Sequence, residues 1–320
     1  MAAYDVDTDG VSETYASLNA ALAALPDPFT ESNTIALNAS TGVKDTTSAR
    51  SIVIDTTSGY SLTITGTADY IYSPSDAAWL EFSHAFGNYY NITIEDVNFE
   101  KPSMSANYQP ILELDSMRDG DIIIKNNRFI SDSGVTDRER LFVIDPNSAY
   151  NATVAVVNSY FRTKGSATHT ASACIGHSDN VPVYMYNNTF VGYQANYLNA
   201  SAALYTNNVI QTTVSGYTVD TNSDYNMFSG AFDLGGANDE QSQTFTFVNL
   251  GTDDVHLQSG DTGARGKGTD LSADGNFPFD YDQDGVTRSA WDAGAFEFVS
   301  AGGLSIPVAM HHYTKNIRSS

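Results

Sequence analysis

The chain contains little cysteine and few basic residues. Cys174 is its single cysteine, which excludes a disulfide within the chain, and its place between Ala173 and Ile175 favours a buried small side chain over a nucleophile. Only 15 Lys and Arg stand against 38 Asp and Glu, so the formal net charge is −23. Because such a chain repels phosphate groups, we expect no nucleic-acid partner.

Long apolar runs are also missing. No segment approaches the roughly 18 consecutive apolar residues of a membrane-spanning helix, so we expect no membrane partner. Tryptophan is rare, with 2 residues, whereas 19 Tyr and 16 Phe accompany many Thr, Ser and Asn residues. This composition is typical of strands joined by tight turns.

A short pattern recurs five times along the chain. Each copy has two apolar residues in alternate positions, then Asn or Asp, then a large apolar residue three positions later. The copies span 92–99, 122–129, 154–161, 183–190 and 203–210, and their polar positions are Asp96, Asn126, Asn158, Asn187 and Asn207. Successive polar positions lie 30, 32, 29 and 20 residues apart, which is the period of a solenoid repeat.

Each repeat predicts one coil of a parallel β-helix. The apolar residues alternate over only three or four positions, which indicates short half-buried strands rather than helices. A second apolar run precedes each copy, such as Leu112-x-Leu114 before Asn126, so each coil holds at least two strands. We therefore predict an all-β, single-stranded parallel β-helix, right-handed like other parallel connections, in which the five polar residues form a structural ladder between coils.

The two ends of such a solenoid need caps, because open coils would expose the core and unpaired strand edges. Residues 12–25 predict an amphipathic helix with Ser12 as its N-cap and Pro26 after its end. We accordingly divide the chain into an N-terminal cap (1–30), a parallel β-helix (31–250), an Asp- and Gly-rich C-terminal cap (251–300) and an extended tail (301–320).

The closing segment carries a resemblance to known proteins. Its run from Asp280 through Gly285, Arg288 and Trp291 to Phe298 resembles the C-terminal cap of right-handed parallel β-helix proteins of the pectate-lyase-like superfold, and Tyr15-Ala16-Ser17-Leu18 is similar to openings in members encoded by tailed phages and uncultured viruses. The resemblance implies the fold and a non-catalytic member. The segment Met1–Asp7 lacks a secretory signal, so we expect a virion protein that is made in the host cytoplasm and released by lysis.

Two Asp-rich segments have the spacing of a calcium loop. The C-terminal copy places Asp280, Asp282 and Asp284 before Gly285, with alternate carboxylates able to face one Ca²⁺ ion. Neither this copy nor the one at Asp5-x-Asp7-x-Asp9-Gly10 has Glu at the twelfth position. The alternative is an Asp-rich turn in which Arg288 pairs with a carboxylate such as Asp292 or Glu297.

Catalysis on this fold would require a pair of carboxylates at a suitable separation. We expect outward-facing acidic residues at Glu113, Asp115, Asp119, Asp121, Asp132, Asp137 and Glu139. With 38 acidic residues such a pair arises by chance, and His84, His169, His177 and His256 are isolated in the sequence. The sequence thus favours a protein that is not an enzyme and identifies no catalytic residue.

The last segment changes character after Glu297. It has no further acidic residue, and Gly302-Gly303 precedes an apolar and then basic peptide. Either this peptide folds back on the cap, or it docks into another virion protein through Ile306, Val308, Met310, Tyr313, Lys315 and Arg318. We favour docking, which makes the protein a structural surface component of a phage-like virion, on the capsid or the tail.

The alternatives to this function are a polysaccharide-binding or polysaccharide-degrading tailspike-like enzyme and a secreted calcium-dependent adhesin. Cell-surface glycan partners and a homo-oligomer remain open.

Overall fold

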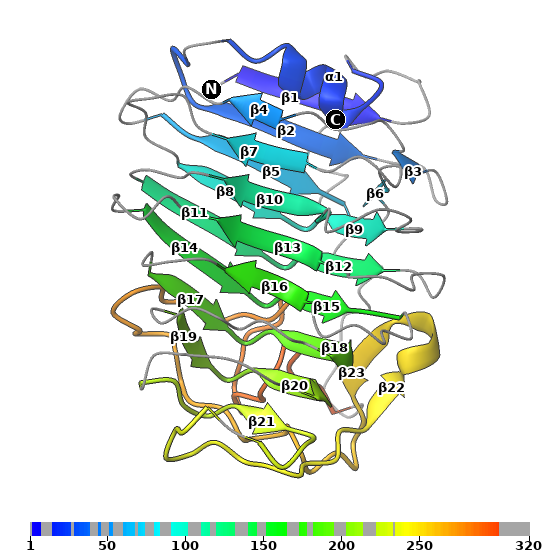
Figure 1. The fold of residues 1–320 in the computed structure, drawn as a ribbon, viewed down its shortest axis with the longest axis vertical. Helices are drawn as coiled ribbons and strands as arrows, with labels where there is room; N and C mark the ends of the chain where they lie inside the picture. The colour runs from blue at the N-terminus through cyan, green and yellow to red at the C-terminus, as the bar shows by residue number, and fades with distance from the viewer. Residues whose placement is uncertain are drawn as a thin grey trace.

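The computed structural model is a parallel β-solenoid whose coils pass through three sheets (Figure 1). It describes residues 2–7, 15–26, 29–38, 44–45, 51–53, 60–67, 70–73, 80–83, 91–101, 110–115, 120–131, 140–145, 152–164, 173–177, 182–194, 203–213, 222–232 and 234–300. From residue 33 to residue 213, each strand of the first sheet (sheet A) is followed by one of the second (sheet B) and, in most coils, by one of the third (sheet C).

The strands of each sheet stack in parallel, coil upon coil. Sheet A contains β1 (Ala2–Asp7), β2 (Asn33–Asn38), β5 (Leu62–Gly66), β8 (Ile92–Glu95), β11 (Gly120–Lys125), β14 (Ala152–Val157), β17 (Val183–Tyr186) and β19 (Ala203–Thr206). Sheet B contains β3 (Lys44–Asp45), β6 (Ile71–Tyr72), β9 (Asn98–Lys101), β12 (Arg128–Ser131), β15 (Tyr160–Arg162), β18 (Thr189–Gln194), β20 (Val209–Thr213) and β21 (Met227–Phe228). Sheet C contains β4 (Ser51–Val53), β7 (Leu80–Ser83), β10 (Leu112–Asp115), β13 (Arg140–Asp145) and β16 (Ala173–His177).

The apolar residues of the repeat fill the interior between the sheets. Phe99, Phe129, Phe161 and Phe190 are buried and form a stack on sheet B, with successive ring centroids 4.7, 4.8 and 5.1 Å apart. Ile122 and Ile124 of β11 lie directly opposite Ile92 and Ile94 of β8, and all four are buried. The predicted solenoid of stacked apolar columns is therefore confirmed.

The described part of the chain contains one α-helix, α1 (Leu18–Ala23), which packs into the core through Leu18, Ala21 and Leu22. The prediction of a helix over 12–25 was too long at its start, because Tyr15 forms a parallel bridge with Val6 and Ser17 is the N-cap. Ser12 lies outside the described residues. No described helix is both long and apolar enough to cross a membrane.

The helix is tied to the first coils through one buried acid. The Asp45 carboxylate accepts a 2.9 Å hydrogen bond from the Leu18 backbone N–H and a 2.6 Å bond from the Tyr70 hydroxyl. Asp45 ends strand β3 of sheet B, so one carboxylate joins the helix to two segments of the solenoid. A buried acid is tolerated here because its Oδ2 atom accepts both hydrogen bonds.

Residues 245–298, which we call the C-terminal segment, turn back and lie against the outside of the later coils. A two-stranded antiparallel hairpin, β22 (Phe247–Asn249) and β23 (Asp254–Leu257) joined through the 3₁₀ helix η1 (Leu250–Thr252), packs beside sheet B (Figure 1). It forms a second apolar cluster of Ile130, Tyr160, Val191, Val209, Met227, Phe245, Phe247, Val255, Leu257, Ala264, Ala293, Ala295 and Phe296. Residues 271–291 similarly cover sheet A in a third cluster of Ala155, Val157, Tyr186, Leu271, Phe279 and Trp291.

Candidate functional site

The corner between sheets A and B is a two-residue turn, and its first residue has a left-handed backbone. The φ angles of Asp96, Asn126, Asn158, Asn187 and Asn207 are 58°, 57°, 48°, 52° and 59°. Asn and Asp occupy this region more readily than other residues with a side chain. The structure thus places all five residues of the predicted ladder at equivalent corners. Tyr225, whose φ is 59°, occupies a sixth corner of this kind.

The second corner residue forms a buried column of hydrogen bonds inside the coils. Asn188 shows the pattern: its Oδ1 accepts a 2.9 Å bond from Ser159 N–H one coil before, and its Nδ2 donates to the Val156 carbonyl oxygen at 2.8 Å. Asn127, Asn208 and Asn226 repeat this arrangement, and the Ser159 hydroxyl takes the equivalent position between Asn127 and Asn188. Each amide therefore serves its neighbouring coil as both donor and acceptor.

An acid ends this column. Asp239 Oδ1 accepts bonds from the Asn226 backbone N–H at 2.8 Å and from Asn226 Nδ2 at 3.1 Å, while Oδ2 accepts from Leu234 and Gly236 N–H. Asp239 is the acceptor in all four of these hydrogen bonds. A carboxylate, which only accepts, therefore satisfies the position better than an amide would.

The first corner residues face outward and hold the C-terminal segment. Asn158 Nδ2 donates to the Tyr281 carbonyl oxygen at 2.8 Å, and Asn187 Nδ2 donates to the Asp292 carbonyl oxygen at 3.0 Å. Asn207 Nδ2 donates to the Thr269 carbonyl oxygen at 2.8 Å and to Asn187 Oδ1 at 3.1 Å. These three side chains bond chiefly to this segment, and the 3.1 Å bond joins one coil to the next.

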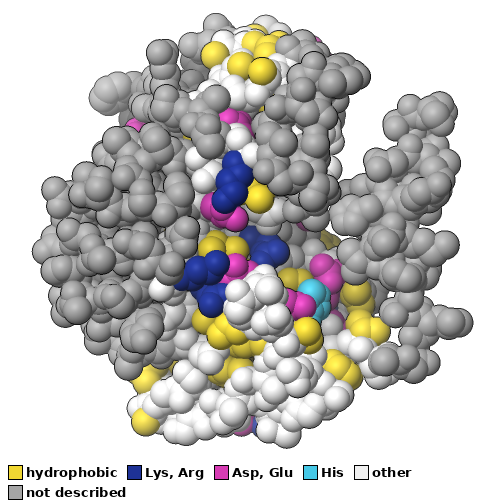
Figure 2. Space-filling model, turned by 90° about the vertical axis from the view of Figure 1, so that its right-hand side faces the viewer, with side chains coloured by type: hydrophobic (Ala, Val, Ile, Leu, Met, Phe, Trp, Pro, Cys, Tyr) yellow, Lys and Arg dark blue, Asp and Glu magenta, His cyan; other side chains and the backbone are white. Residues whose placement is uncertain are grey.

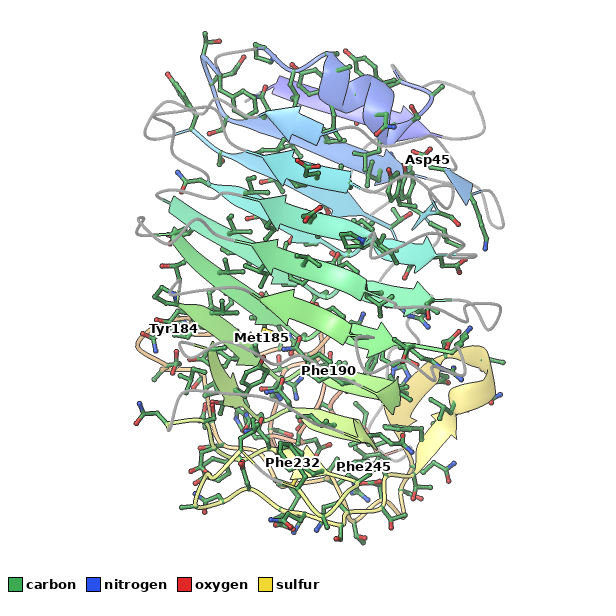
Figure 3. The ribbon with its side chains drawn as sticks, viewed as in Figure 1. Asp45, Tyr184, Met185, Phe190, Phe232 and Phe245 are labelled. Carbon is green, nitrogen blue, oxygen red and sulfur yellow. The ribbon has the colours of Figure 1, made fainter. Side chains whose placement is uncertain are left out.

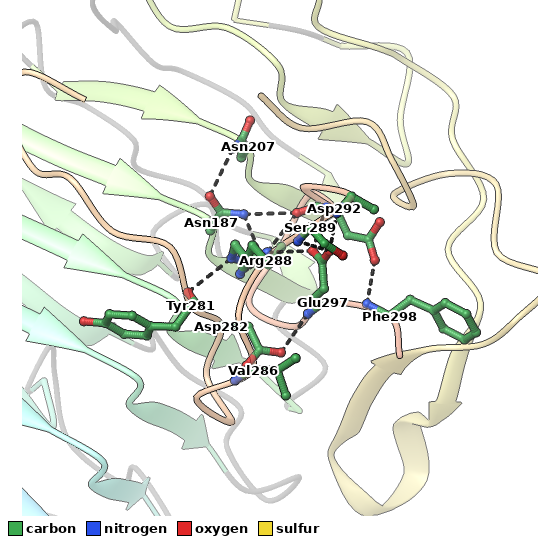
Figure 4. Close-up of polar contacts among 12 residues, drawn as sticks. Asn187, Asn207, Tyr281, Asp282, Val286, Arg288, Ser289, Asp292, Glu297 and Phe298 are labelled. Carbon is green, nitrogen blue, oxygen red and sulfur yellow. Dashed lines mark hydrogen bonds and ion pairs between the residues drawn. The ribbon is translucent and has the colours of Figure 1, made fainter. Parts of the chain in front are cut away.

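The centre of this interface is the buried guanidinium of Arg288 (Figure 4). Its Nη2 donates to Asn158 Oδ1 at 2.9 Å and to the Gly294 carbonyl oxygen at 2.9 Å, and its Nε donates to the Tyr281 carbonyl oxygen at 3.2 Å. Its Nη1 lies 3.6 Å from Glu297 Oε2, which confirms the predicted pairing of Arg288 with a cap carboxylate. Burial lowers the pKa of Arg288 to about 10, against the opposing effect of Asp282 and Glu297.

Three buried carboxylates around Arg288 accept hydrogen bonds from the backbone. Asp282 Oδ1 accepts from Val286 N–H at 2.8 Å and Oδ2 from Glu297 N–H at 2.9 Å. Glu297 accepts from the N–H groups of Ser289, Ala290 and Asp292, and Asp292 accepts from Gly266 and Phe298. Burial raises the pKa of Asp282 to about 6. The four charged side chains act as a structural lock for the segment, which we call the Arg288 cluster.

The three Asp residues proposed for Ca²⁺ have different surroundings in the structure. Asp282 points into the Arg288 cluster, Asp284 Oδ2 contacts His256 Nε2 at 2.7 Å, and Asp280 is exposed. Among the residues that the structure describes, no group of three or more His, Cys, Asp or Glu side chains could hold a metal ion. In the N-terminal copy, Asp5 and Asp7 belong to strand β1, and Asp9 lies outside the described residues.

A charged strip fastens the β22–β23 hairpin to sheet B (Figure 2). Arg162 and Lys164 pair with the Asp253 carboxylate, and Arg128 Nη2 donates to the Asp253 carbonyl oxygen at 2.7 Å. Beside it, His256 lies between Asp254 and Asp284, with nitrogen–oxygen distances of 2.6 and 2.7 Å. Burial lowers the pKa of His256, but the hydrogen bonds to Asp284 and Asp254 outweigh this effect and raise it to about 9.

Several other candidate residues are placed only in part. Glu113 lies in β10 opposite Glu81 and Val143 of the neighbouring coils, Asp115 ends the same strand, and Asp121 is exposed in β11 opposite Thr153. Asp119, Asp132, Asp137 and Glu139 lie outside the described residues, as do the tail residues Ile306, Val308, Met310, Tyr313, Lys315 and Arg318.

Comparison with known proteins identifies no relative. No protein-family model matches the chain, and no curated protein matches it either. The class that the structure defines is therefore the parallel β-solenoid alone.

Proposed function

We propose that this protein is a structural surface component of a phage-like virion, associated with the capsid or the tail. The observation that supports this role best is the use of charged residues in the Arg288 cluster. Arg288, Asp282, Asp292 and Glu297 are buried and bond to backbone groups of their own chain. They hold the C-terminal segment on several coils, as suits a rigid structural rod rather than a reaction centre.

Finer features of the fold belong to the same proposal. We take the solenoid to be right-handed, since parallel strand connections almost always are. Helix α1 serves as the N-terminal cap within residues 1–30, the coils occupy 31–250, and residues 251–300 act as the C-terminal cap. In this role the segment protects the later coils from the side, through Asn158, Asn187 and Asn207.

The anchor in this proposal is the tail at 301–320. Its apolar residues, including Ile306, Val308 and Met310, provide the contact with a neighbouring virion protein, and Lys315 and Arg318 face an acidic surface on that partner. Tyr313 lies between the two groups in the sequence. Gly302-Gly303 separates this tail from the cap, which favours docking on a partner over folding back on the rod.

The test is whether the chain is part of the particle. We expect it to copurify with intact virions at a stoichiometric copy number, and a chain that lacks residues 302–320 to fold normally but fail to incorporate. The double variant Lys315→Glu and Arg318→Glu should show a smaller loss of incorporation. Full incorporation of the truncated chain would contradict the anchor, and absence of the protein from purified particles would contradict the proposed function itself.

A further inference from the structure

Three cationic side chains on the outer face of sheet B share one carboxylate. Arg162 Nη1 contacts Asp253 Oδ1, and Lys164 Nζ lies 2.7 Å from Asp253 Oδ2. Arg128 Nη2 donates to the backbone carbonyl oxygen of the same Asp at 2.7 Å. We call these four residues the basic cluster. Three cations against one carboxylate leave it a formal charge of +2, in a chain whose formal net charge is −23.

The acidic side chains nearest to the basic cluster have cations of their own. Glu100 pairs with Lys44, and Asp254 and Asp284 share His256, with nitrogen–oxygen distances of 2.6 and 2.7 Å. His256 is positively charged at neutral pH, because its hydrogen bonds to the two acids outweigh burial and raise its pKa to about 9. These groups therefore offset at most one of the two excess positive charges.

A buried phenol lies among these cations. Tyr160 is fully buried in the second apolar cluster, together with Phe245 of the segment that leads into β22 (Figure 3). Arg128 Cζ lies 5.7 Å from the centroid of the Tyr160 ring. Burial raises the pKa of Tyr160, whereas Arg162 and Arg128 oppose this effect, so both guanidinium groups lie near the phenol.

This arrangement has donors in excess of acceptors. Within the part of the chain that the structure describes, the Tyr160 hydroxyl has no hydrogen-bond partner. The neighbouring cations cannot accept its O–H, because guanidinium and ammonium groups only donate. The bonds to the hairpin also come from one nitrogen of each guanidinium, Nη1 of Arg162 and Nη2 of Arg128. An anion, which only accepts, would satisfy the remaining donors together.

We propose that the basic cluster binds a small tetrahedral dianion, the chemistry that sulfate, phosphate and phosphate monoesters share. The side chains of Lys164 and Arg162 are 26% and 16% exposed, so an ion can reach them from solvent, and cationic side chains lie together in the middle of Figure 2. Guanidinium groups suit such an ion because they offer several N–H donors in one plane. A monoanion would leave part of the excess charge uncompensated.

A small ion also avoids the acidic remainder of the surface. Charges further away than a Debye length of about 8 Å are largely screened at physiological salt, so a small dianion responds mainly to the basic cluster. A long polyanion would extend past it and meet the other acids of a chain with 38 Asp and Glu residues.

The bound ion would join two layers of the molecule. Arg128 lies in β12 and Arg162 in β15 of sheet B, whereas Asp253 follows η1 in the hairpin. A dianion between the guanidinium groups and Lys164 would relieve the repulsion among the cations that hold the hairpin. We therefore expect slower hydrogen exchange in β22 and β23 when the ion is bound. This proposal does not depend on the proposed virion role.

The test titrates the full chain with sodium sulfate, sodium phosphate and O-phosphoserine, with acetate as the monoanion control and sodium chloride keeping the ionic strength constant. Calorimetry should show saturable binding of a dianion with a Kd of about 0.1–1 mM, and Tm should rise by about 2 °C at saturation. Acetate should do neither. Concentrations stay in the low millimolar range, where the general stabilisation by sulfate and phosphate is small. Binding of O-phosphoserine as tight as that of phosphate would identify a phosphoryl group carried on a larger molecule as a ligand, and binding of the inorganic ions alone would identify the free ion.

Variants locate the site. Tyr160→Phe should weaken binding about tenfold and leave Tm in chloride unchanged, because its hydroxyl has no described partner to lose. Lys164→Met should weaken binding by a similar factor. Lys44→Met removes the same charge elsewhere on sheet B and should bind normally.

Three results would overturn the proposal. The first is the absence of saturable binding by any of the dianions. The second is normal binding by both Tyr160→Phe and Lys164→Met. The third is a lower Tm of Tyr160→Phe in chloride, which would show that the hydroxyl is already bonded within the fold.

Discussion

The early and late coils of this solenoid use the same inner core but differ on their outer face. In β2 and β8 the residues alternate strictly between buried and partly exposed, as one-sided strands do. In β14 the last four residues, Val154–Val157, are all buried, because the C-terminal segment covers the outside of sheet A there. A strand of the same sheet thus becomes two-sided when a second layer packs on it.

This difference predicts unequal stability along one continuous fold. An outward position in an early coil is free to be polar, as Thr34, Thr63 and Thr93 are in register on β2, β5 and β8. The equivalent position on β14 is Ala155, which is buried. Burial on a second face adds stabilisation only to the later coils, so we expect them to open last.

The largest expected effect comes from a charge in the core that both regions share. Ile124→Asp should prevent folding, because it buries an unpaired carboxylate in the continuous apolar column. Ile123→Asp, one position along the same strand but facing outward, is the matched control and should give a folded protein. Circular dichroism and limited proteolysis distinguish the two, and a folded Ile124→Asp variant would contradict the register.

A second pair of variants separates the two regions directly. Ala155→Asp should destabilise the protein by about 3–5 kcal/mol, because the carboxylate is buried beneath the C-terminal segment. Thr93→Asp lies in the same outward column but outside the third cluster, and should change the free energy of unfolding by less than about 0.5 kcal/mol. Denaturant titration measures both, and equal losses would refute the claimed difference between the faces.

Substitutions at the corner between sheets A and B should cost less stability, by an amount that depends on which of the two corner residues is changed. Asn127→Ala should cost on the order of 1–3 kcal/mol, since it leaves the Val97 N–H and the Ile94 carbonyl without their partner. Asn126→Gly keeps the left-handed backbone and should cost far less. Thermal melting should rank the variants in this order; the reverse order would place the coil-to-coil contacts at the first corner position.

The smallest effect is a pH dependence in the late region. The pKa of His256 is raised to about 9 from an ordinary value of about 6.5, so its stabilising contribution is fully present below pH 6.5 and is lost as pH rises through 9. Because the side chain is 42% exposed, the contribution should stay below about 1 kcal/mol. His256→Gln should flatten this part of the stability curve, and an NMR titration midpoint near 6.5 would contradict the Asp254–His256–Asp284 arrangement.

Much of the solenoid was predictable from the sequence, because a period of about 30 residues and inward Ile, Val and Phe positions are local signals. The direction of the corner side chains was harder to predict. The doublets Asn126-Asn127, Asn187-Asn188 and Asn207-Asn208 were a visible signal, but only the backbone shows that the first residue turns outward and the second inward.

The position of the C-terminal segment depended on long-range contacts that periodicity does not reveal. Its bonds to Asn158 and Asn187 join residues more than 100 positions apart in the chain. A weak clue was present in the run Val154-Ala155-Val156-Val157, which is apolar on both faces where the repeat needs only one apolar face. Such a strand indicates a covering layer but does not say which segment supplies it.

The central claim is that the C-terminal segment stabilises the later coils from outside, and hydrogen exchange read by mass spectrometry tests it most directly. In Arg288→Met, which removes the guanidinium from Asn158 and four backbone carbonyl groups, we predict faster exchange in β14, β17 and β19 and unchanged exchange in β2, β5 and β8. Lys44→Met, which breaks the ion pair with Glu100 at the other end of the molecule, is the control and should leave the late coils unchanged. Equal acceleration in early and late coils of Arg288→Met, or none in either, would contradict the account.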